Sequence, residues 1–549
     1  MPHLFKRNRA LLDGALQAMK TREFWTPFPE VPSGKIYGET ARADGEADFA
    51  ALVGKPFSIP DHPEDVHLGK EQSPWGLELD LSYPAAPVQT LLAASEAAFA
   101  EWSQTNIETR VGVLLEVLSR LNKKSFLIGH ATVHTTGQAF PMAFQAGGPH
   151  AQDRGLEAVA AAYAEMTASA LDAVWQKPQG RGEPIVLRKH WTVVPRGISL
   201  TIGCNTFPCW NSYPGLFASL ATGNTAIVKP HPMAILPLAI TVKVLREVLA
   251  EEGLPVDTVL LAADEPETPV TREIVEAAAV KIVDYTGSST FGGWIRKNAG
   301  DALLFTEETG VNSVVITGTG DFSGMCANLA FSFALYSGQM CTSPQNIYAP
   351  KAGIDTDEGH KSFDEVISGI AAAIDHLLAD PEQASSICGT IVSPATMKRI
   401  ETARSAGRIV RDSGTASAGR SATPLIVAVG DEDKLHEQEC FGPVVFAIAT
   451  GTAAEAIDRA ACLARDKGAI TAAVYATDQH LIDGAAASFA RAGVNLSVNL
   501  TGNIYVNQSA AFSDFHVTGA NPAGNASLTD TAFVAPRFRR VMIRWPISD

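Results

Sequence analysis

The chain has 549 residues, of which 46% are hydrophobic and 19% are charged, and its formal net charge is −16. This length exceeds what one hydrophobic core usually holds, so we expect a soluble protein with several folded units. The acidic balance argues against nucleic acid or an anionic membrane surface as the main partner, because both attract basic proteins. No apolar run approaches the roughly 20 residues that a membrane span needs.

The first third of the chain changes character twice. Residues 1–85 are rich in proline and charge, and we expect an irregular extension wrapped on a larger body. A basic start resembles a transit peptide, but Asp13 interrupts it, and an ordinary amphipathic helix is favoured over residues 1–20. Residues 86–172 are alanine-rich with helical spacing, and residues 184–187 and 191–194 are predicted as two strands of a hairpin-like arm.

Strands and helices alternate from residue 198 on, which indicates parallel α/β sheets. The first run has predicted strands at 198–202, 225–228, 258–262, 280–285 and 302–306, and helices at 236–250 and 271–278. After Gly310 a second run has predicted strands at 312–317, 425–429, 444–449 and 471–476, and helices at 323–335, 363–378 and 453–465. A strand at 540–543 in the basic tail could pair with the arm across subunits, because exposed strand edges attract partners.

Seven cysteines, an odd number, show no spacing typical of a disulfide framework, and there is no CxxC pair for zinc. We therefore predict a reduced, cytoplasmic protein without a metal centre. Only Cys341 has informative neighbours, because it stands where an apolar helix gives way to a loop and its thiol is presented. A presented thiol becomes a nucleophile when a local charge lowers its pKa, and the sequence does not show the source of that charge.

Two segments indicate a nucleotide site. Residues 285–292, Tyr-Thr-Gly-Ser-Ser-Thr-Phe-Gly, follow a predicted strand and open a helix, where backbone N–H groups favour a phosphate. This is not GxGxxG, and a plain serine-glycine turn is an alternative. Lys229 ends another predicted strand, at the edge where α/β sheets bind ligands, although a solvated strand end would look the same.

Polar residues at other strand ends are candidates for catalysis. Glu307 and Glu308 follow a predicted strand, where a buried carboxylate serves as a general base, and a solvated loop pair is the alternative. Glu439 precedes a Gly-Pro turn. Asn205 follows the strand at 198–202 and could donate to an oxyanion; a structural turn residue is the alternative, and Asn211 is a rival.

Five segments in order resemble motifs of the aldehyde dehydrogenase superfamily, over about residues 86–520. They are Ala-Phe-Ala-Glu-Trp at 98–102, Ala-Thr-Gly-Asn-Thr through Lys-Pro at 221–230, Thr-Gly-Ser through Gly at 286–292, Gly-Gln-Met-Cys at 338–341 and Glu-Cys-Phe-Gly-Pro at 439–443. The resemblance implies an α/β fold with a Rossmann-type cofactor domain, an α/β catalytic domain and a small β oligomerisation arm. The implied parts are an N-terminal extension (1–85), a dinucleotide-binding domain (86–182 and 197–309), an arm (183–196 and 525–549) and a catalytic domain (310–524).

The resemblance also implies roles for single residues. Cys341 matches the nucleophile and Glu307, 34 positions before it, matches the general base, with Glu308 one position off. Asn205 matches the oxyanion-binding residue if one residue is inserted before Phe207. The matching cofactor contacts are Lys229, Gly287, Ser288, Gly292, Glu439 and Phe441.

The chain departs from the family's pattern in three places. The family's Glu-Leu-Gly-Gly is Glu-Glu-Thr-Gly at 307–310, and its Phe-Gly-Gly-x-Lys is replaced at 511–516, so we expect an unusual substrate mouth. Pro232 stands where NAD-preferring members often place a glutamate on the ribose. We therefore predict NADP as the cofactor, with NAD as the alternative, and His231 could add partial positive charge.

Within the superfamily, the Asn-Thr-Phe-Pro-Cys-Trp stretch at 205–210, the Glu-Glu-Thr-Gly-Val-Asn-Ser stretch at 307–313 and the long extension are most similar to the PaaN group of phenylacetate degradation. That resemblance implies oxidation of a small aldehyde, plausibly a CoA-linked semialdehyde, by a homodimer or homotetramer. One alternative is a CoA-acylating dehydrogenase, which Glu307 disfavours because such enzymes usually lack the water-activating glutamate. The other is a catalytically silent scaffold on the same fold.

Overall fold

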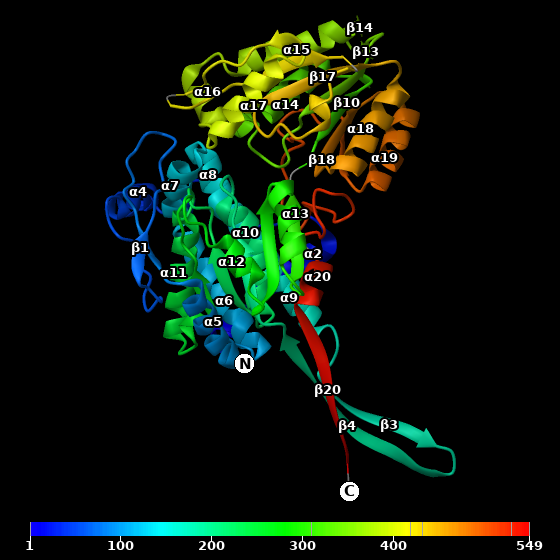
Figure 1. The fold of residues 1–549 in the computed structure, drawn as a ribbon. Helices are drawn as coiled ribbons and strands as arrows, with labels where there is room; N and C mark the ends of the chain where they lie inside the picture. The colour runs from blue at the N-terminus through cyan, green and yellow to red at the C-terminus, as the bar shows by residue number, and fades with distance from the viewer. Residues whose placement is uncertain (1, 309, 418, 431, 529, 548–549) are drawn as a thin grey trace.

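Two β-sheets, one in each half of the chain, organise the fold of the computed structural model, which describes residues 2–308, 310–417, 419–430, 432–528 and 530–547. In Figure 1 the first sheet lies in the middle of the molecule, the second lies above it, and a narrow arm projects below. The predicted α/β architecture with two sheet-bearing parts and a β arm is confirmed. Thr309, within the predicted Glu-Glu-Thr-Gly stretch, lies outside the described residues.

The first sheet is parallel throughout, in the strand order β7, β6, β5, β8, β9. Its strands are β5 Ile198–Ile202, β6 Thr225–Lys229, β7 Val259–Leu261, β8 Val280–Gly287 and β9 Leu303–Glu308. Alternate residues feed two cores, because Val228 packs on one face and Ile227 on the other. The helices on these faces are α5 Val88–Trp102, α10 Pro208–Ala221, α11 Leu236–Glu251, α12 Thr271–Glu276 and α13 Ser289–Asn298. Burial on both faces explains why β5, β6 and β7 are short, fully buried strands close to their predicted positions. β9 extends to Glu308, two residues beyond its predicted end, so Glu307 and Glu308 are part of the strand.

The second sheet is also mostly parallel and covered by helices on both faces. Its strand order is β15, β16, β17, β12, β10, β18, β19, and only the edge strand β15 is antiparallel to its neighbour. The strands are β10 Ser313–Ile316, β12 Asn346–Pro350, β15 Arg408–Arg411, β16 Leu425–Val429, β17 Val444–Thr450, β18 Thr471–Tyr475 and β19 Asn495–Val498. The helices α14 Phe322–Ala334 and α15 Phe363–Leu377 cover one face, and α17 Pro394–Arg404, α18 Ala453–Lys467 and α19 Gln479–Ala492 cover the other.

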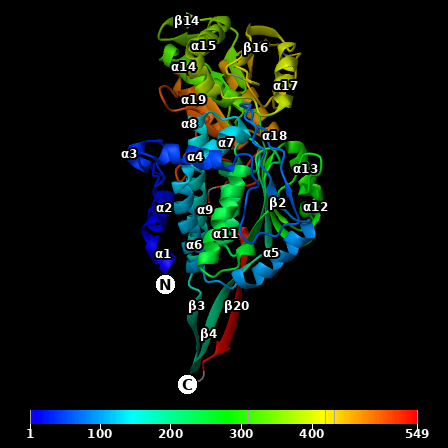
Figure 2. The same ribbon diagram turned by 90° about the vertical axis from the view of Figure 1, so that its left-hand side faces the viewer.

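The N-terminal extension is more helical than its composition predicts. It contains α1 His3–Arg7, α2 Arg9–Thr21, α3 Gly34–Tyr37 and α4 Ala41–Leu52, followed by the short strands β1 Val66–Leu68 and β2 Tyr83–Ala85. The amphipathic helix predicted near the start is confirmed as α2, which buries Leu12, Ala15 and Ala18. Figure 2 shows α1 and α2 along one side of the helical layer and α4 across its upper part, where α4 packs on α7. The members of this layer are α6 Ile107–Lys123, α7 Ser125–Thr136, α8 Phe140–Gly147 and α9 Pro149–Thr167.

The arm corrects the sequence prediction. Residues 184–187 and 191–194 belong to one long strand, β4 Gly182–Pro195, which pairs with β3 Asp172–Gln179 on one side and β20 Phe538–Pro546 on the other. No turn-forming residue separates the two predicted segments, whereas Gly180 adopts a φ of +52° and forms the actual turn. The predicted tail strand is confirmed, but it pairs with β4 of the same chain. The arm also includes β3, which the predicted boundary at 183 leaves out.

The smaller elements complete the chain. They are β11 Gly318–Thr319, β13 Ile354–Thr356, β14 Gly359–Lys361, α16 Pro381–Cys388 and α20 Thr531–Val534. Within the described ranges, no helix combines the length and the apolar character that crossing a membrane would require.

One buried carboxylate fixes the extension to the first half. Glu71 accepts hydrogen bonds from the backbone N–H groups of Ile235 and Leu236, where α11 begins, and from the Tyr83 hydroxyl. Burial raises the pKa of Glu71 to about 7 in spite of these bonds. The anchor positions the residues that follow it, from Gln72 to Gly76, in the wall of the main crevice described below.

Replacement of Glu71 by glutamine is expected to stabilise the protein above neutral pH. Because folding raises the pKa of Glu71 from 4.5 to about 7, its contribution is fully present below the unfolded value and is lost as the pH rises through the folded value. Glutamine does not ionise and keeps an acceptor for α11. Between about pH 5 and about pH 8, the unfolding free energy of Glu71→Gln relative to wild type should rise by about 2–3 kcal/mol in chemical denaturation. The exposed Glu78→Gln is the control, and a pH-independent difference for Glu71→Gln would contradict this assignment.

Candidate active site

A crevice of about 780 Å³ lies where the C-terminal ends of the first sheet's strands face the second half of the chain. The segment 204–207, which follows β5, and residues 286–288 at the end of β8 form one wall. Cys341, Arg399, Glu439 and Phe441 line it from the second half, and Trp75 lines it from the extension. Ligands of open α/β sheets bind at this edge, so the fold itself directs attention to this crevice.

The loop that carries Cys341 leaves its helix through an unusual turn. α14 ends at Ala334, as predicted to within one residue, and Tyr336, Ser337 and Gly338 then adopt φ values of +50°, +50° and +62°. Left-handed conformations are unfavourable for side chains other than glycine, so the surroundings must impose them. Tyr336 donates its hydroxyl to the Thr136 carbonyl and Ser337 lies 2.7 Å from the Ala422 carbonyl. Buried hydrogen bonds therefore hold the turn that ends the helix before Cys341.

Asn312 fixes the loop on the other side of the thiol. Its amide donates to the carbonyls of Cys341 at 2.8 Å and Ser343 at 2.9 Å. Its oxygen accepts from the backbone N–H groups of Ile470 at 2.9 Å and Thr471 at 3.1 Å. One buried carboxamide thus ties the loop of Cys341 to the start of β18 in the second sheet.

The Cys341 thiol lines the crevice and lies close to a buried carboxylate and a buried imidazole that are not part of the crevice lining. The Cys341 sulfur lies 3.6 Å from His516 Nε2, and the same nitrogen lies 3.0 Å from Glu307 Oε1. Glu307 is 2% exposed and His516 is 3% exposed. The sequence analysis missed His516; it noted that residues 511–516 depart from the family's motif, but no pattern singles out a histidine there.

The two candidate asparagines, Asn205 and Asn211, have different surroundings. Asn211 Nδ2 lies 3.2 Å from both carboxylate oxygens of Glu307, so this amide holds Glu307 in place. Asn205 lines the crevice, and its carboxamide oxygen is buried and makes no hydrogen bond to any described residue. Asn205 is therefore the carboxamide that remains available to a ligand.

The electrostatics of this site oppose ionisation of the thiol. Burial raises the pKa of Cys341 well above its ordinary value, and the neighbouring Glu307 carboxylate raises it further. Both effects disfavour a thiolate, because one removes water and the other adds like charge. The protein alone therefore holds Cys341 as a neutral thiol at neutral pH.

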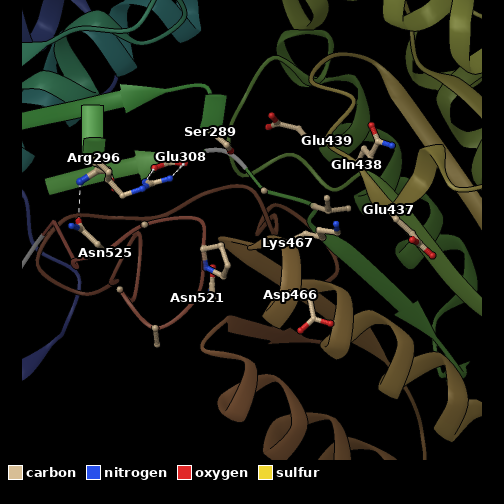
Figure 3. Close-up of a pocket in the computed structure, with 17 residues that line it drawn as sticks. Ser289, Arg296, Glu308, Glu437, Gln438, Glu439, Asp466, Lys467, Asn521 and Asn525 are labelled. Atoms are coloured by element: carbon tan, nitrogen blue, oxygen red, sulfur yellow. Dashed lines mark hydrogen bonds and ion pairs between the residues drawn. The ribbon is translucent and has the colours of Figure 1, made fainter. Parts of the chain in front are cut away.

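The two consecutive glutamates point to opposite sides of β9. Glu307 contacts His516 and Asn211, whereas Glu308 forms an ion pair with Arg296 and lines a second cleft of about 730 Å³. Figure 3 shows Glu308 and Arg296 in this second cleft, with Asn521 and Asn525 of the C-terminal segment beside them. The geometry places Glu307, and not Glu308, beside the thiol.

The predicted cofactor contacts divide into two groups. Gly287, Ser288, Glu439 and Phe441 line the crevice, and the Ser288 side chain caps the N-terminus of α13. Lys229 does not line it; the ammonium group is buried and lies 2.7 Å from Asp264. Gly292 also lies elsewhere, because a Cβ atom there would meet the Glu308 carboxylate at 2.4 Å.

His231 corrects an expectation about charge. It lines the crevice beside Met233, but burial, reinforced by the Lys229 ammonium, lowers its pKa to about 4. The imidazole is therefore neutral at physiological pH and does not supply the partial positive charge expected from the sequence.

This architecture is shared with known proteins. A solved NAD-dependent aldehyde dehydrogenase from Burkholderia multivorans is 48% identical, with a TM-score of 0.98 over 100% of both chains. The N-succinylglutamate 5-semialdehyde dehydrogenase of Burkholderia cenocepacia (strain HI2424) is 27% identical over 390 residues, which cover 69% of this chain and 75% of that protein. The Thermus thermophilus 1-pyrroline-5-carboxylate dehydrogenase R100A mutant shares the fold, with a TM-score of 0.76 at 18% identity over 96% of this chain and 99% of that one.

A model of the aldehyde dehydrogenase family matches residues 82–524, which contain both sheets together with Cys341, Glu307 and His516. Together with the near-identical fold of the Burkholderia multivorans structure, the match over both sheets, Cys341, Glu307 and His516 shows that the chain belongs to the aldehyde dehydrogenase family.

Proposed function

We propose that this protein oxidises an aldehyde to a carboxylic acid through a thioester on Cys341, with a nicotinamide dinucleotide as hydride acceptor. The observation that carries the proposal is the proximity of the Cys341 thiol, which lines the crevice, to the buried Glu307 carboxylate, whose ligand oxygen lies within 4.8 Å of the sulfur. Family membership supports it and disfavours the catalytically silent alternative. The four-part division into extension, dinucleotide-binding part, arm and catalytic part stays a proposal, with the arm extended to include β3.

The crevice fits a dinucleotide. Gly287 precedes α13, and a side chain there would lie 2.5 Å from the Tyr285 hydroxyl, so the backbone is left uncovered beside the helix N-terminus. Such a terminus favours a phosphate. Phe441 and Glu439 line the wall on the side of Cys341. A bound nicotinamide dinucleotide supplies the hydride acceptor.

The chain's own residues would perform the remaining steps. The Cys341 sulfur attacks the aldehyde carbon and loses its proton, for which His516 Nε2, 3.6 Å away, is an acceptor within reach. The Asn205 carboxamide donates to the oxyanion, a contact whose removal typically lowers kcat about 10²–10³-fold. Glu307, held by Asn211, then takes a proton from the water that hydrolyses the thioester.

Glutamine at position 307 is expected to separate the two halves of the reaction. Glu307→Gln should lower steady-state kcat by about 10²–10⁴-fold, because the water is no longer activated, while a burst of about one reduced cofactor per subunit persists. Glu308→Gln, on the opposite side of the same strand, is the matched control and should keep wild-type turnover. Stopped-flow absorbance of the reduced nicotinamide measures both. Normal hydrolytic turnover by Glu307→Gln, or a larger loss for Glu308→Gln, would refute this assignment.

The CoA-acylating alternative is tested on the products of the same reaction. Product analysis by mass spectrometry with and without added CoA distinguishes a free acid from an acyl-CoA. We expect the free acid in both cases, because Glu307 is oriented beside the thiol.

We propose that the cofactor preference is weak. Pro232 supplies no carboxylate to repel a 2′-phosphate, His231 is neutral, and the charge of Lys229 is paired with Asp264. Selectivity needs an attractive or a repulsive element, and these positions offer neither. The name of the similar Burkholderia multivorans protein points to NAD, whereas Pro232 favours NADP. These two indications are opposed, which agrees with a weak preference.

The ratio of kcat/KM for NADP to that for NAD is therefore expected to lie within about tenfold of one. Pro232→Glu should reduce the efficiency with NADP by at least about tenfold and leave that with NAD nearly unchanged, because it adds charge beside the ribose. A wild-type preference above about a hundredfold in either direction would contradict the proposal.

The substrate is proposed by class. The curated relatives named N-succinylglutamate 5-semialdehyde dehydrogenase act, by that name, on an aldehyde at the end of a carboxylate-bearing chain. The PaaN resemblance implies a CoA-linked semialdehyde, and that finer prediction rests on the sequence alone. Both resemblances lead us to propose an anionic semialdehyde as the substrate. We also propose that the protein is cytoplasmic. A screen of reduced-nicotinamide formation over neutral aldehydes, carboxylate semialdehydes and CoA-linked semialdehydes tests it.

We propose that the arm joins copies of this chain into a homodimer or homotetramer. Large apolar side chains are exposed along it, namely Val174, Trp175, Ile185, Val541, Met542, Ile543 and Trp545. A projecting sheet with open edges and an apolar surface is typical of an interface.

Charges on the arm should dissociate the oligomer. Val541→Asp with Ile543→Asp is expected to reduce the mass measured by light scattering to that of one chain. Ile36→Asp, which changes an exposed isoleucine of α3, should keep the wild-type mass. A monomeric wild type, or an arm variant of unchanged mass, would exclude this interface.

A further inference from the structure

Three different metal-binding side chains converge on one point beside the crevice that Cys341 lines. Glu307 comes from the end of β9, Cys341 from the loop after α14, and His516 from the segment after β19. Their donor atoms all lie within 4.8 Å of one another. Thiolate, imidazole and carboxylate are the ligand types that zinc selects in proteins.

The spacing of the donors suits a tetrahedral ion. Zinc bonds of about 2.3 Å to sulfur and about 2.0–2.1 Å to nitrogen and oxygen place tetrahedral donors roughly 3.3–3.6 Å apart. The observed separations are 3.6 Å between sulfur and Nε2, and 3.0 Å between Nε2 and Oε1. The third pair, the Cys341 sulfur and the Glu307 oxygen, lies within 4.8 Å.

The histidine's contacts favour a common central partner over a proton relay. In a Cys-His-acid triad the two ring nitrogens serve two different partners. Here Nε2 faces both the sulfur and the carboxylate, and Nδ1 is buried without a partner among the described residues. An ion in place of the shared proton would satisfy all three donors at once.

The surroundings hold the donors in place. Asn211 contacts both oxygens of Glu307, and the Trp210 ring packs edge-on against His516 with the ring centroids 4.5 Å apart. Such outer contacts fix ligand orientation in metal sites. Cys341 and Asn211 line the crevice, so an ion can enter from it and keep an open fourth position for water.

We propose that Cys341, His516 and Glu307 form an inhibitory site for a thiophilic divalent cation such as Zn²⁺. Binding forms one bond from the ion to each donor and releases the thiol proton to solvent, with no change of oxidation state. A bound ion occupies the nucleophile and the base together, so it stops the reaction until a chelator removes it. The binding stands on the geometry alone, and the inhibition rests on the proposed function. No sequence spacing predicts the site, because positions 307, 341 and 516 are far apart in the chain.

Direct binding measurements on the full-length protein test the proposal. After EDTA treatment and dialysis, cobalt chloride should give the near-ultraviolet absorption of a thiolate–cobalt bond at one ion per chain, and zinc chloride should displace it. Zinc should slow the alkylation of Cys341 by iodoacetamide at least about tenfold, and EDTA should restore it, with the labelled peptide identified by mass spectrometry. Magnesium chloride, a hard cation that prefers oxygen ligands, should do neither.

Matched variants locate the site. Cys341→Ser should abolish the thiolate–cobalt absorption, and His516→Gln should weaken zinc binding at least about tenfold. The exposed residues Cys462 and His480 provide the controls Cys462→Ser and His480→Gln, which should bind zinc like wild type. Thermal unfolding of each variant confirms that it is folded.

Each outcome bears on one proposal. Absence of a one-to-one complex in wild type, or zinc binding unchanged in both Cys341→Ser and His516→Gln, would overturn the metal site. Because cobalt absorption and alkylation need no turnover, zinc binding without dehydrogenase activity would support this site and refute the proposed function. Activity without zinc binding would support the proposed function and refute the metal site.

Discussion

The active crevice depends on holding a thiol from one half of the chain within reach of a carboxylate from the other. The chain passes from Glu308, the last residue of β9, to Ser313, the first residue of β10, in a few residues, so the two sheets are joined beside the site. The C-terminal segment adds a second tie, because Ala523 accepts from the Glu308 N–H at 2.6 Å and Asn525 accepts from the Thr306 N–H at 2.8 Å. These bonds fix the strand that carries Glu307. The same segment delivers His516, so one stretch of chain both braces the crevice and supplies a functional side chain.

The held geometry has an electrostatic consequence. A buried carboxylate beside a half-buried thiol keeps the thiol neutral, since both desolvation and Glu307 raise the pKa of Cys341. The site at rest therefore protects its nucleophile from oxidants and alkylating agents, which react with thiolates. Ionisation needs a proton acceptor or a positive charge that arrives with a ligand. The proximity of His516 Nε2 to both groups allows the proton to move within the cluster, which a sequence pattern around Cys341 alone could not reveal.

Sequence reasoning succeeded where burial is uniform and failed where contacts are distant. The strands at 198–202 and 425–429 match the structure residue for residue, because every side chain faces a core and the apolar run equals the strand. The arm was divided in two because its exposed residues lack such a run, although the missing turn signal at 188–190 argued for one strand. Lys229 was expected in the crevice, yet its partner Asp264 lies in a segment without any motif. His516 was missed for the same reason, since its partners at 307 and 341 are distant in the chain.

The alternation of side chains along β9 explains how two adjacent glutamates come to serve different surroundings. Successive residues of a strand face opposite sides, so Glu307 faces His516 and Cys341 if Glu308 enters the cleft lined by Arg296. Arg296 neutralises Glu308, and Gly292 of α13 leaves room for that carboxylate where any Cβ atom would collide with it. The glycine that resembles part of a phosphate-binding turn is therefore explained by packing against Glu308. The register of β9 at its end therefore decides which carboxylate stands beside the thiol.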